Sequence, residues 1–229
     1  MFPVQFSQFV QKGKHRTECQ DKTHSSCIND IASISLADGA GSCKHAGKGA
    51  LAVCNNIHRY MSKNFERFDS SKPNHEMRGF IVADIRHELD GLASELGCNV
   101  IELGSTLLYA GTDGYKLVII HLGDGWIFGL KERDIDILSE PENGNGPQFT
   151  YLTSSKNIEQ HVWVKVLPAS DYQVILLCSD GFSVVEFIKS LKLKALNARR
   201  DFAQIYDVAH QITQNILPSD DASCIMMQY

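Results

Sequence analysis

The chain has 229 residues, of which 43% are hydrophobic and 21% are charged, and its formal net charge is −5. This composition argues against a disordered or fibrous protein, and basic residues scattered through an acidic chain exclude a broad nucleic-acid-binding face. No Pro/Ser-rich linker divides the sequence, so we expect one domain over residues 1–229.

The seven cysteines are spread along the chain without a C-x-x-C pair, which is typical of reduced thiols rather than of a zinc site or a disulfide framework. The N-terminus lacks a basic segment followed by an apolar run, and the longest apolar stretches, such as 174–178, are too short to span a bilayer. We therefore expect a cytoplasmic protein with no membrane partner.

The first half of the chain predicts a strand followed by two helices. An apolar run at 31–37 ends in the glycine-rich turn 38–42, which is the pattern of a buried strand. Apolar residues then recur at helical spacing over 50–61 and over 77–96, and Gly97 is placed to end the second helix.

The second half predicts mainly strands and one long helix. Short β-rich runs indicate strands at 105–109, 116–121, 126–130, 172–178 and 222–229. The Asp113-Gly114 pair favours an antiparallel hairpin between the first two. Apolar residues at helical spacing over 202–216, followed by Pro218, predict the helix.

Two further segments are predicted to lie at the surface. Residues 143–147 have the Asn, Gly and Pro content of an exposed loop. Residues 189–200 contain five basic residues among leucines and alanines, which favours a solvated helix or an insertion, with phosphopeptide docking as the alternative. Strands and helices in separate groups predict an α+β fold, a four-layer αββα sandwich with central antiparallel sheets.

Aspartates at strand ends are the candidate site. Asp38, Asp124, Asp180 and either Asp220 or Asp221 each lie at a tight turn or strand boundary. Any one Asp-Gly pair can be only a turn dipeptide. The buried runs before Asp38 and Asp180, however, should bring carboxylates to one edge of the core, where Mg²⁺ or Mn²⁺ would neutralise them better than zinc.

Six short motifs also occur in the order typical of one family, and the sequence resembles the PP2C-type, or PPM, phosphatases, in a divergent branch that is common in bacteria. The likeness extends through nearly the whole chain. The motifs are Arg16 to Asp21, Asp38-Gly39-Ala40-Gly41-Ser42, Gly104-Ser105-Thr106, Gly123-Asp124-Gly125, Ser179-Asp180-Gly181-Phe182 and Asp220-Asp221-Ala222-Ser223.

The resemblance implies a metal-dependent serine/threonine phosphoprotein phosphatase with two cations, Mn²⁺ or Mg²⁺, and a third held more weakly. Asp38 would bridge the two cations, with the Gly39 carbonyl on one of them. Asp180 and Asp220 would complete the other shell, and motif register favours Asp220 over Asp221. The resemblance also implies that Arg16 binds the substrate phosphate and that Asp124 binds the third cation.

Two positions depart from the family pattern. Gln20 stands where many members have Glu, so it would act only in the outer shell of a cation, beside Asp21. Ala40 stands where eukaryotic-type members have a His proposed to protonate the leaving group. His45 could substitute for that acid but is more typical of a surface histidine, and His121 is more typical of a structural one.

Three functions therefore stay open from the sequence. The first is an active phosphatase acting on a phosphorylated protein beside a partner Ser/Thr kinase. The second is a catalytically weak pseudophosphatase that binds phosphoproteins, which Gln20 and Ala40 favour. The third is an unrelated sandwich with a small-molecule site, which the ordered motifs disfavour.

Overall fold

A computed structural model describes residues 3–72, 74–143, 150–194, 197, 201–216 and 219–229. Within these residues, ten strands form two five-stranded antiparallel sheets, in the orders β1-β10-β9-β6-β7 and β2-β3-β4-β5-β8. The strands are β1 (Gln5–Gln11), β2 (Lys22–Ile28), β3 (Ile31–Ala37), β4 (Leu107–Thr112), β5 (Lys116–Leu122), β6 (Trp126–Leu130), β7 (Ile135–Ser139), β8 (Trp163–Pro168), β9 (Val174–Cys178) and β10 (Ala222–Gln228).

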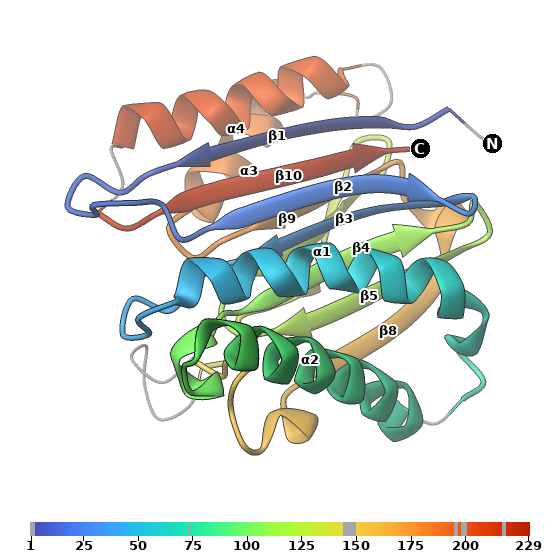
Figure 1. Cartoon of the computed structure of the whole chain (residues 1–229). Helices are drawn as coiled ribbons and strands as arrows, with labels where there is room; N and C mark the ends of the chain where they lie inside the picture. The colour runs from blue at the N-terminus through green and yellow to red at the C-terminus, as the bar shows by residue number, and fades with distance from the viewer. Residues whose placement is uncertain (1–2, 73, 144–149, 195–196, 198–200, 217–218) are drawn as a thin grey trace.

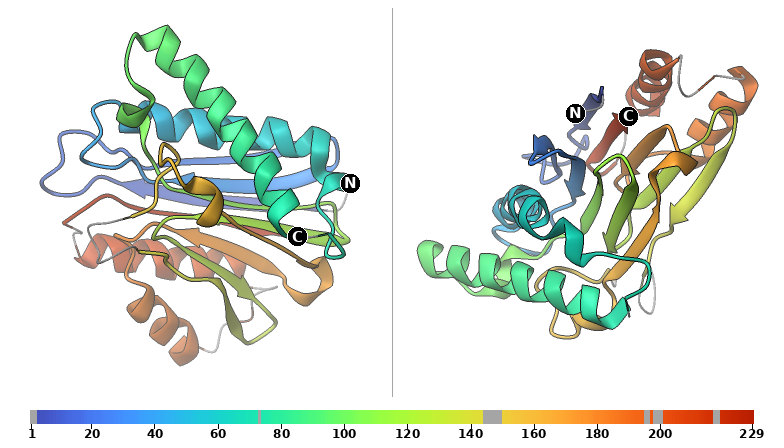
Figure 2. Two further views of the ribbon diagram at one scale, coloured as in Figure 1. Left: turned by 90° about the horizontal axis from the view of Figure 1, so that it is seen from below. Right: turned by 90° about the vertical axis from the view of Figure 1, so that its right-hand side faces the viewer.

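Four α-helices cover the outer faces of the two sheets (Figures 1 and 2). Helices α1 (Ala46–Asn64) and α2 (Asn74–Leu96) pack on the sheet that contains β3, and α3 (Val184–Lys194) and α4 (Phe202–Ile216) pack on the sheet that contains β9. A third apolar cluster fills the space between the sheets. The fold is therefore the αββα sandwich that the sequence predicts, with α+β class and antiparallel sheets.

Successive side chains of the inner strands point to opposite faces of the sheet, so each of these strands contributes to two apolar clusters. In β9, Ile175 and Leu177 point into the space between the sheets, whereas Val174, Leu176 and Cys178 pack under α3 and α4. Successive side chains of a strand point to opposite faces, so a strand buried on both faces is apolar throughout. The continuous apolar run of β9 was readable for this reason, and β3 is buried throughout although it contains Ser33 and Ser35.

The predicted elements are confirmed with small shifts in their bounds. The strand expected at 105–109 begins later, at Leu107, and continues to Thr112, because Ser105 bonds instead to Thr153 in a neighbouring loop. Helix α2 ends before Gly97, whose φ of +62° is the left-handed conformation expected of a terminating glycine.

Several elements have no counterpart among the sequence predictions. They are β1, β2, β7, β8 and the start of α3. Their burial patterns are mixed rather than apolar, so no continuous run marks them. The basic residues at 189–194 are exposed on α3, in agreement with a solvated helix. The predicted loop at 143–147 and Pro218 lie mostly or wholly outside the described residues.

The antiparallel registers bring the acidic turns to one end of the sandwich. Ala37 lies opposite Lys22, and Leu107 lies opposite Leu122, so the turns after β3 and β5 share an end of one sheet. In the other sheet, Cys178 lies opposite Cys224, near the start of β10. Figure 1 shows these strand ends on the same side of the molecule. No helix among the described residues is long and apolar enough to cross a bilayer.

Candidate active site

The predicted site residues surround one pocket of about 240 Å³ at this end of the sandwich. Each of the four predicted aspartates that follow or precede a strand contributes to it, and so does one arginine from the loop between β1 and β2. The lining residues named by the sequence prediction are Arg16, Asp38, Gly39, Asp124, Asp180 and Asp220. Side chains from both sheets therefore meet in a single pocket.

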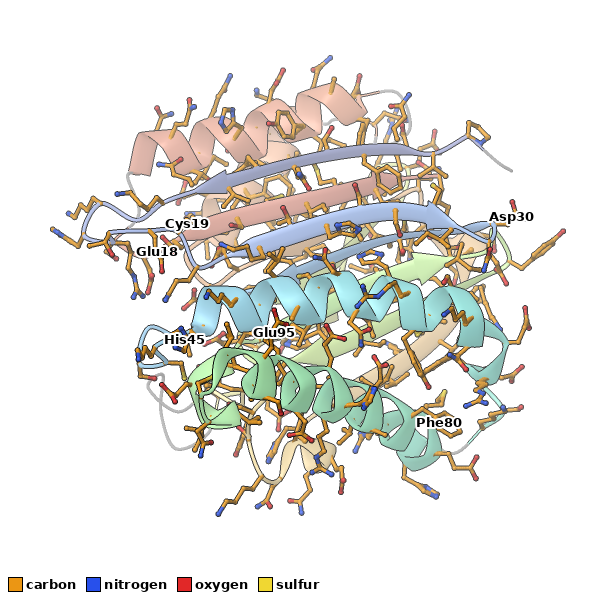
Figure 3. All side chains as sticks on the ribbon, viewed as in Figure 1. Glu18, Cys19, Asp30, His45, Phe80 and Glu95 are labelled. Atoms are coloured by element: carbon orange, nitrogen blue, oxygen red, sulfur yellow. The ribbon has the colours of Figure 1, made fainter. Side chains whose placement is uncertain are left out.

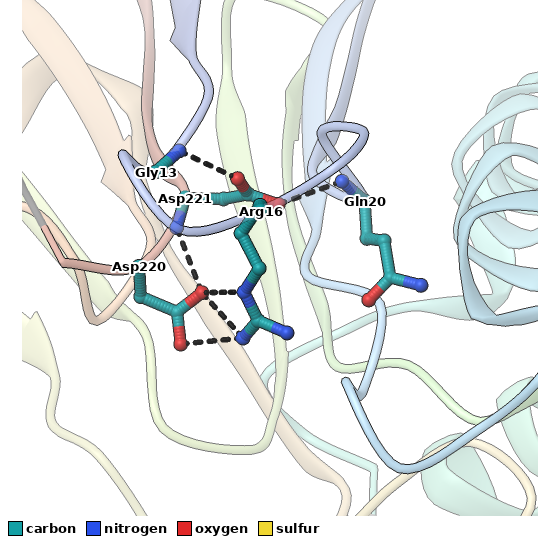
Figure 4. A network of polar contacts seen from close by, with 5 residues as sticks. All are labelled: Gly13, Arg16, Gln20, Asp220 and Asp221. Atoms are coloured by element: carbon teal, nitrogen blue, oxygen red, sulfur yellow. Dashed lines mark hydrogen bonds and ion pairs between the residues drawn. The ribbon is translucent and has the colours of Figure 1, made fainter.

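Arg16 and Asp220 form a bidentate ion pair across this pocket (Figure 4). The Arg16 Nε donates to Oδ1 of Asp220 at 2.7 Å, and Nη2 donates to Oδ2 at 2.7 Å. The hydrogen bond and charge of Asp220 raise the pKa of Arg16. A Cβ at Gly41 would overlap the Arg16 guanidinium, so a glycine is needed there for this side chain to lie flat over the turn.

The neighbouring Asp221 has a different environment. It is buried, and its two carboxylate oxygens accept hydrogen bonds from the backbone N–H groups of Gly13 (2.8 Å) and Gln20 (2.7 Å) (Figure 4). These bonds fix both ends of the loop that presents Arg16. Both oxygens of Asp221 are thus engaged by the backbone, whereas Asp220 faces the pocket.

The pocket concentrates negative charge. Burial raises the pKa of Asp38 well above its usual value, and the charges of Asp21 and Asp180 raise it further. Crowding by the protein around the Asp180 carboxylate, followed by the charges of Asp124 and Asp220, raises the pKa of Asp180 to about 6. Crowded carboxylates disfavour one another's ionised form unless a cation compensates them.

Asp21 provides the test of whether a cation fits. This residue is 1% exposed, and neither of its carboxylate oxygens makes a hydrogen bond of normal geometry. Burial raises the pKa of Asp21, and the nearby Ser223, Asp38 and Ser179 side chains offset only part of that rise. A buried carboxylate without a partner is costly, and bound cations are one of the few ways to compensate it. The donors at this end of the sandwich are carboxylate, carbonyl and hydroxyl oxygens, which suit Mg²⁺ and Mn²⁺ and not Zn²⁺.

The carboxylates are not drawn together into a finished shell. Across the part of the chain that the structure describes, no three Asp, Glu, His or Cys side chains are close enough to form a ready-made metal site. Asp220 is instead paired with Arg16.

Of the two departures from the family pattern, Gln20 is not among the residues that line the pocket and Ala40 is. Gln20 packs beside Gly39, where a Cβ on the glycine would lie 2.9 Å from the Gln20 Cβ. Ala40 lines the pocket and offers no proton donor from its side chain.

Neither of the two candidate histidines lines the pocket. His45 lies just before α1 (Figure 3), and its backbone N–H donates to Glu102. His121 is buried, and its ring bonds to Ser139 and to the Gly123 carbonyl, as expected of a structural histidine.

Six lining residues were not predicted as site residues: Ala40, Gly41, Ser42, Thr106, Thr150 and Leu152. Thr106 Oγ1 accepts from the Asp38 N–H at 2.9 Å and steadies that turn, and Thr150 Oγ1 donates to Asp124. Thr106 could have been found from its place in the Gly-Ser-Thr motif. Thr150 belongs to none of the six motifs, so no sequence signal marks it as a site residue.

Comparison with known proteins identifies the family of this chain. A family model described as protein phosphatase 2C matches residues 12–218. No curated protein sequence shows a significant match.

Three similar solved structures share the fold. They are the serine/threonine phosphatase Stp1 from Staphylococcus aureus (16% identity, TM-score 0.73, covering 100% of this chain and 96% of that chain), the Mycobacterium tuberculosis phosphatase PstP/Ppp (15%, 0.64, 98% and 98%) and RsbX in complex with magnesium (14%, 0.64, 98% and 94%). Because the family model covers most of the sequence, this chain belongs to the protein phosphatase 2C family.

Proposed function

We propose that this protein is an active metal-dependent phosphatase that hydrolyses phosphoserine and phosphothreonine in proteins, opposite a partner Ser/Thr kinase. The observation that carries the proposal is one pocket in which four strand-end aspartates face an arginine, at the positions of the family's motifs. The family is metal-dependent, and RsbX, which shares this fold, is described in complex with magnesium.

Different aspartates would bind each of the two cations. Asp38 would bridge them, with the Gly39 carbonyl on one, while Asp180 and Asp220 complete the shell of the other. Asp124, oriented by Thr150, would hold a third more weakly, and Gln20 would act from the outer shell. Mg²⁺ or Mn²⁺ bound there supplies Lewis acidity and an activated water.

The residues of the chain then position the phosphoryl group. Arg16 is paired with Asp220 in the structure, and it would offer its planar fork to two phosphate oxygens when a cation takes Asp220 from it. The Gly13 and Gln20 N–H groups donate to Asp221 and hold the loop that presents Arg16. In the reaction, water attacks phosphorus in line and the ester P–O bond breaks. The leaving alkoxide takes a proton and becomes the Ser or Thr hydroxyl, and inorganic phosphate is the other product.

A second function is favoured by one specific feature. The described residues that line the pocket include no histidine, and Ala40 offers no acid, so the proton for the leaving group would come from solvent. Loss of a general acid costs about 10²-fold or more in rate. A pseudophosphatase that binds phosphoproteins with little turnover is therefore the alternative outcome.

Hydrolysis of a phosphothreonine peptide with Mn²⁺, Mg²⁺ or EDTA tests the proposal. Turnover should require a cation and fall by about 10³-fold in Asp38→Asn and in Asp180→Asn, because each removes charge aimed at the cations. Asp90→Asn, an exposed change on α2, is the matched control and should keep wild-type activity. Cation binding without turnover would instead establish the pseudophosphatase, and turnover in EDTA would contradict both.

A further inference from the structure

A second and larger hollow, of about 630 Å³, adjoins the acidic pocket. The two share Ser42 and Leu152 in their linings, so they are continuous at that point. The hollow has no part in holding cations or phosphate in the scheme above. Its walls come from the turn after β3, the 3₁₀ helix Val100–Leu103 and the loop that follows Thr150.

Hydrogen bonds tie these three segments together. The His45 N–H donates to the Glu102 carbonyl at 2.9 Å, and the Thr153 N–H donates to the Ser105 carbonyl at 2.8 Å. Asn99 and Glu102 form a capping box at the start of the 3₁₀ helix. The hollow is therefore preformed, and binding there would not require ordering of its walls.

The charge of the hollow is opposite to that of the pocket beside it. Lys44 and Lys156 are exposed in its lining, and the structure shows neither ammonium group in an ion pair or hydrogen bond with another described residue. The one acid in the lining, Glu102, is half-buried and accepts the Asn99 N–H at 2.9 Å. The two exposed lysines make the hollow a local site for an anion, although the chain as a whole is acidic.

We propose that the hollow receives an acidic side chain that flanks the phosphorylated residue of the substrate, so that the enzyme prefers phosphosites in acidic sequences. The inference rests on the proposed function and adds the class of substrate. An extended peptide advances about 3.3 Å per residue, so a residue two or three positions away reaches an adjoining hollow. Ile101, 62% exposed in the lining, offers an apolar contact to the peptide.

Matched phosphothreonine peptides test this preference. One series has Glu at the flanking positions, a second has Ala and a third has Lys. Hydrolysis of p-nitrophenyl phosphate, which has no flanking residues, measures the activity of the acidic pocket alone. Wild-type kcat/KM should rank Glu over Ala over Lys, with about 3- to 10-fold between Glu and Ala at low ionic strength. In a Lys44→Ala/Lys156→Ala double variant the peptides should become equal within about twofold, and p-nitrophenyl phosphate hydrolysis should stay unchanged.

The matched control is a Lys48→Ala/Lys63→Ala double variant, which removes two lysines of α1 that do not line the hollow. It should keep the wild-type ranking. A wild-type enzyme that treats the three peptides alike, or a ranking that survives in Lys44→Ala/Lys156→Ala, would overturn the inference while leaving the phosphatase intact.

If no substrate is hydrolysed, the proposed function fails and the inference is decided by binding alone. Fluorescence anisotropy of the labelled Glu and Ala peptides, measured with Mn²⁺ on Asp38→Asn so that the peptide stays intact, gives that result. Tighter binding of the Glu peptide that disappears with both lysines supports the inference. Equal binding of the two peptides contradicts it.

Discussion

Two buried polar groups near β2 differ in how completely the chain hydrogen-bonds them. His58 of α1 is buried against the sheet, with Ser26 and Ser33 hydroxyls on Nδ1 at 2.9 and 2.6 Å and the Ser35 hydroxyl on Nε2 at 2.9 Å. Asp21, just before β2, is equally buried, and neither carboxylate oxygen makes a hydrogen bond of normal geometry.

The difference in hydrogen bonding between His58 and Asp21 distinguishes a structural cluster from a binding site. A buried polar group that the chain satisfies by itself stabilises one arrangement of the fold. A buried charge that the chain leaves unsatisfied lowers stability unless a ligand compensates it. On this basis the His58 cluster is a structural element, and the acidic end is a binding site.

Among the variants that extend this comparison, Arg16→Ala has the largest expected effect, because Arg16 is paired within the chain and also lines the pocket. Arg16→Ala should lower kcat/KM for a phosphothreonine peptide by about 10²-fold, since it removes a bidentate charge-assisted grip on phosphate. The same variant should bind Mn²⁺ more tightly, because Asp220 loses its competing cation. Kinetics and calorimetry measure the two effects, and weaker Mn²⁺ binding would contradict the assignment of Asp220.

The contribution of His58 to the free energy of unfolding should depend on pH, which tests its structural role. Burial, with a smaller contribution from the nearby His24, lowers the pKa of His58 from 6.5 to about 3. The unfolded chain therefore binds one more proton than the folded chain between these values, so this contribution to stability is complete above pH 6.5 and is lost as pH falls towards 3.

Urea unfolding at two pH values checks that sign. Between pH 7 and pH 5, His58 alone should reduce the free energy of unfolding by about 2 kcal/mol. His58→Gln keeps polar groups in the cluster without titrating, so its loss over this range should be smaller than the wild-type loss by that amount. The exposed His87→Gln is the control. If His58→Gln and the wild type lose the same free energy of unfolding between pH 7 and pH 5, His58 is not the source of the pH dependence.

Asp21→Asn gives the smallest expected change and tests the other half of the comparison. Without added cation, replacing an uncompensated buried charge with an amide should raise the free energy of unfolding by about 1 to 2 kcal/mol, or roughly 2 to 8 °C in Tm for a domain of this size. The stabilisation gained on adding Mn²⁺ should shrink. Thermal unfolding in EDTA and in Mn²⁺ measures both, and a lower Tm in EDTA with an unchanged Mn²⁺ response would refute the argument.

Much of the fold could be predicted from the sequence because the inner strands are apolar on both faces. The apolar run of β9 and the largely apolar run of β3, each ending in an aspartate, were readable for this reason. Strands such as β2 could not be read in the same way. Its serines and histidine are matched to His58 and Ser33 by tertiary contacts that no local pattern records.

The site was predictable as a set of strand-end aspartates but not in its details. Motif register favours Asp220 over Asp221 without giving a physical reason. Their environments differ because Gly13 and Gln20, roughly two hundred residues earlier, donate hydrogen bonds to Asp221. Likewise, Lys44 and Lys156 meet in one hollow because three distant segments are hydrogen-bonded together.

Calorimetric titration of Mn²⁺ into the wild type, Asp38→Asn, Asp180→Asn and the Asp90→Asn control tests most directly whether the acidic end is a cation site. The structure leads us to expect more than one bound ion in the wild type and the control, with clearly weaker or fewer ions in both pocket variants. Identical titrations of all four proteins, or no Mn²⁺ binding by the wild type, would contradict the account.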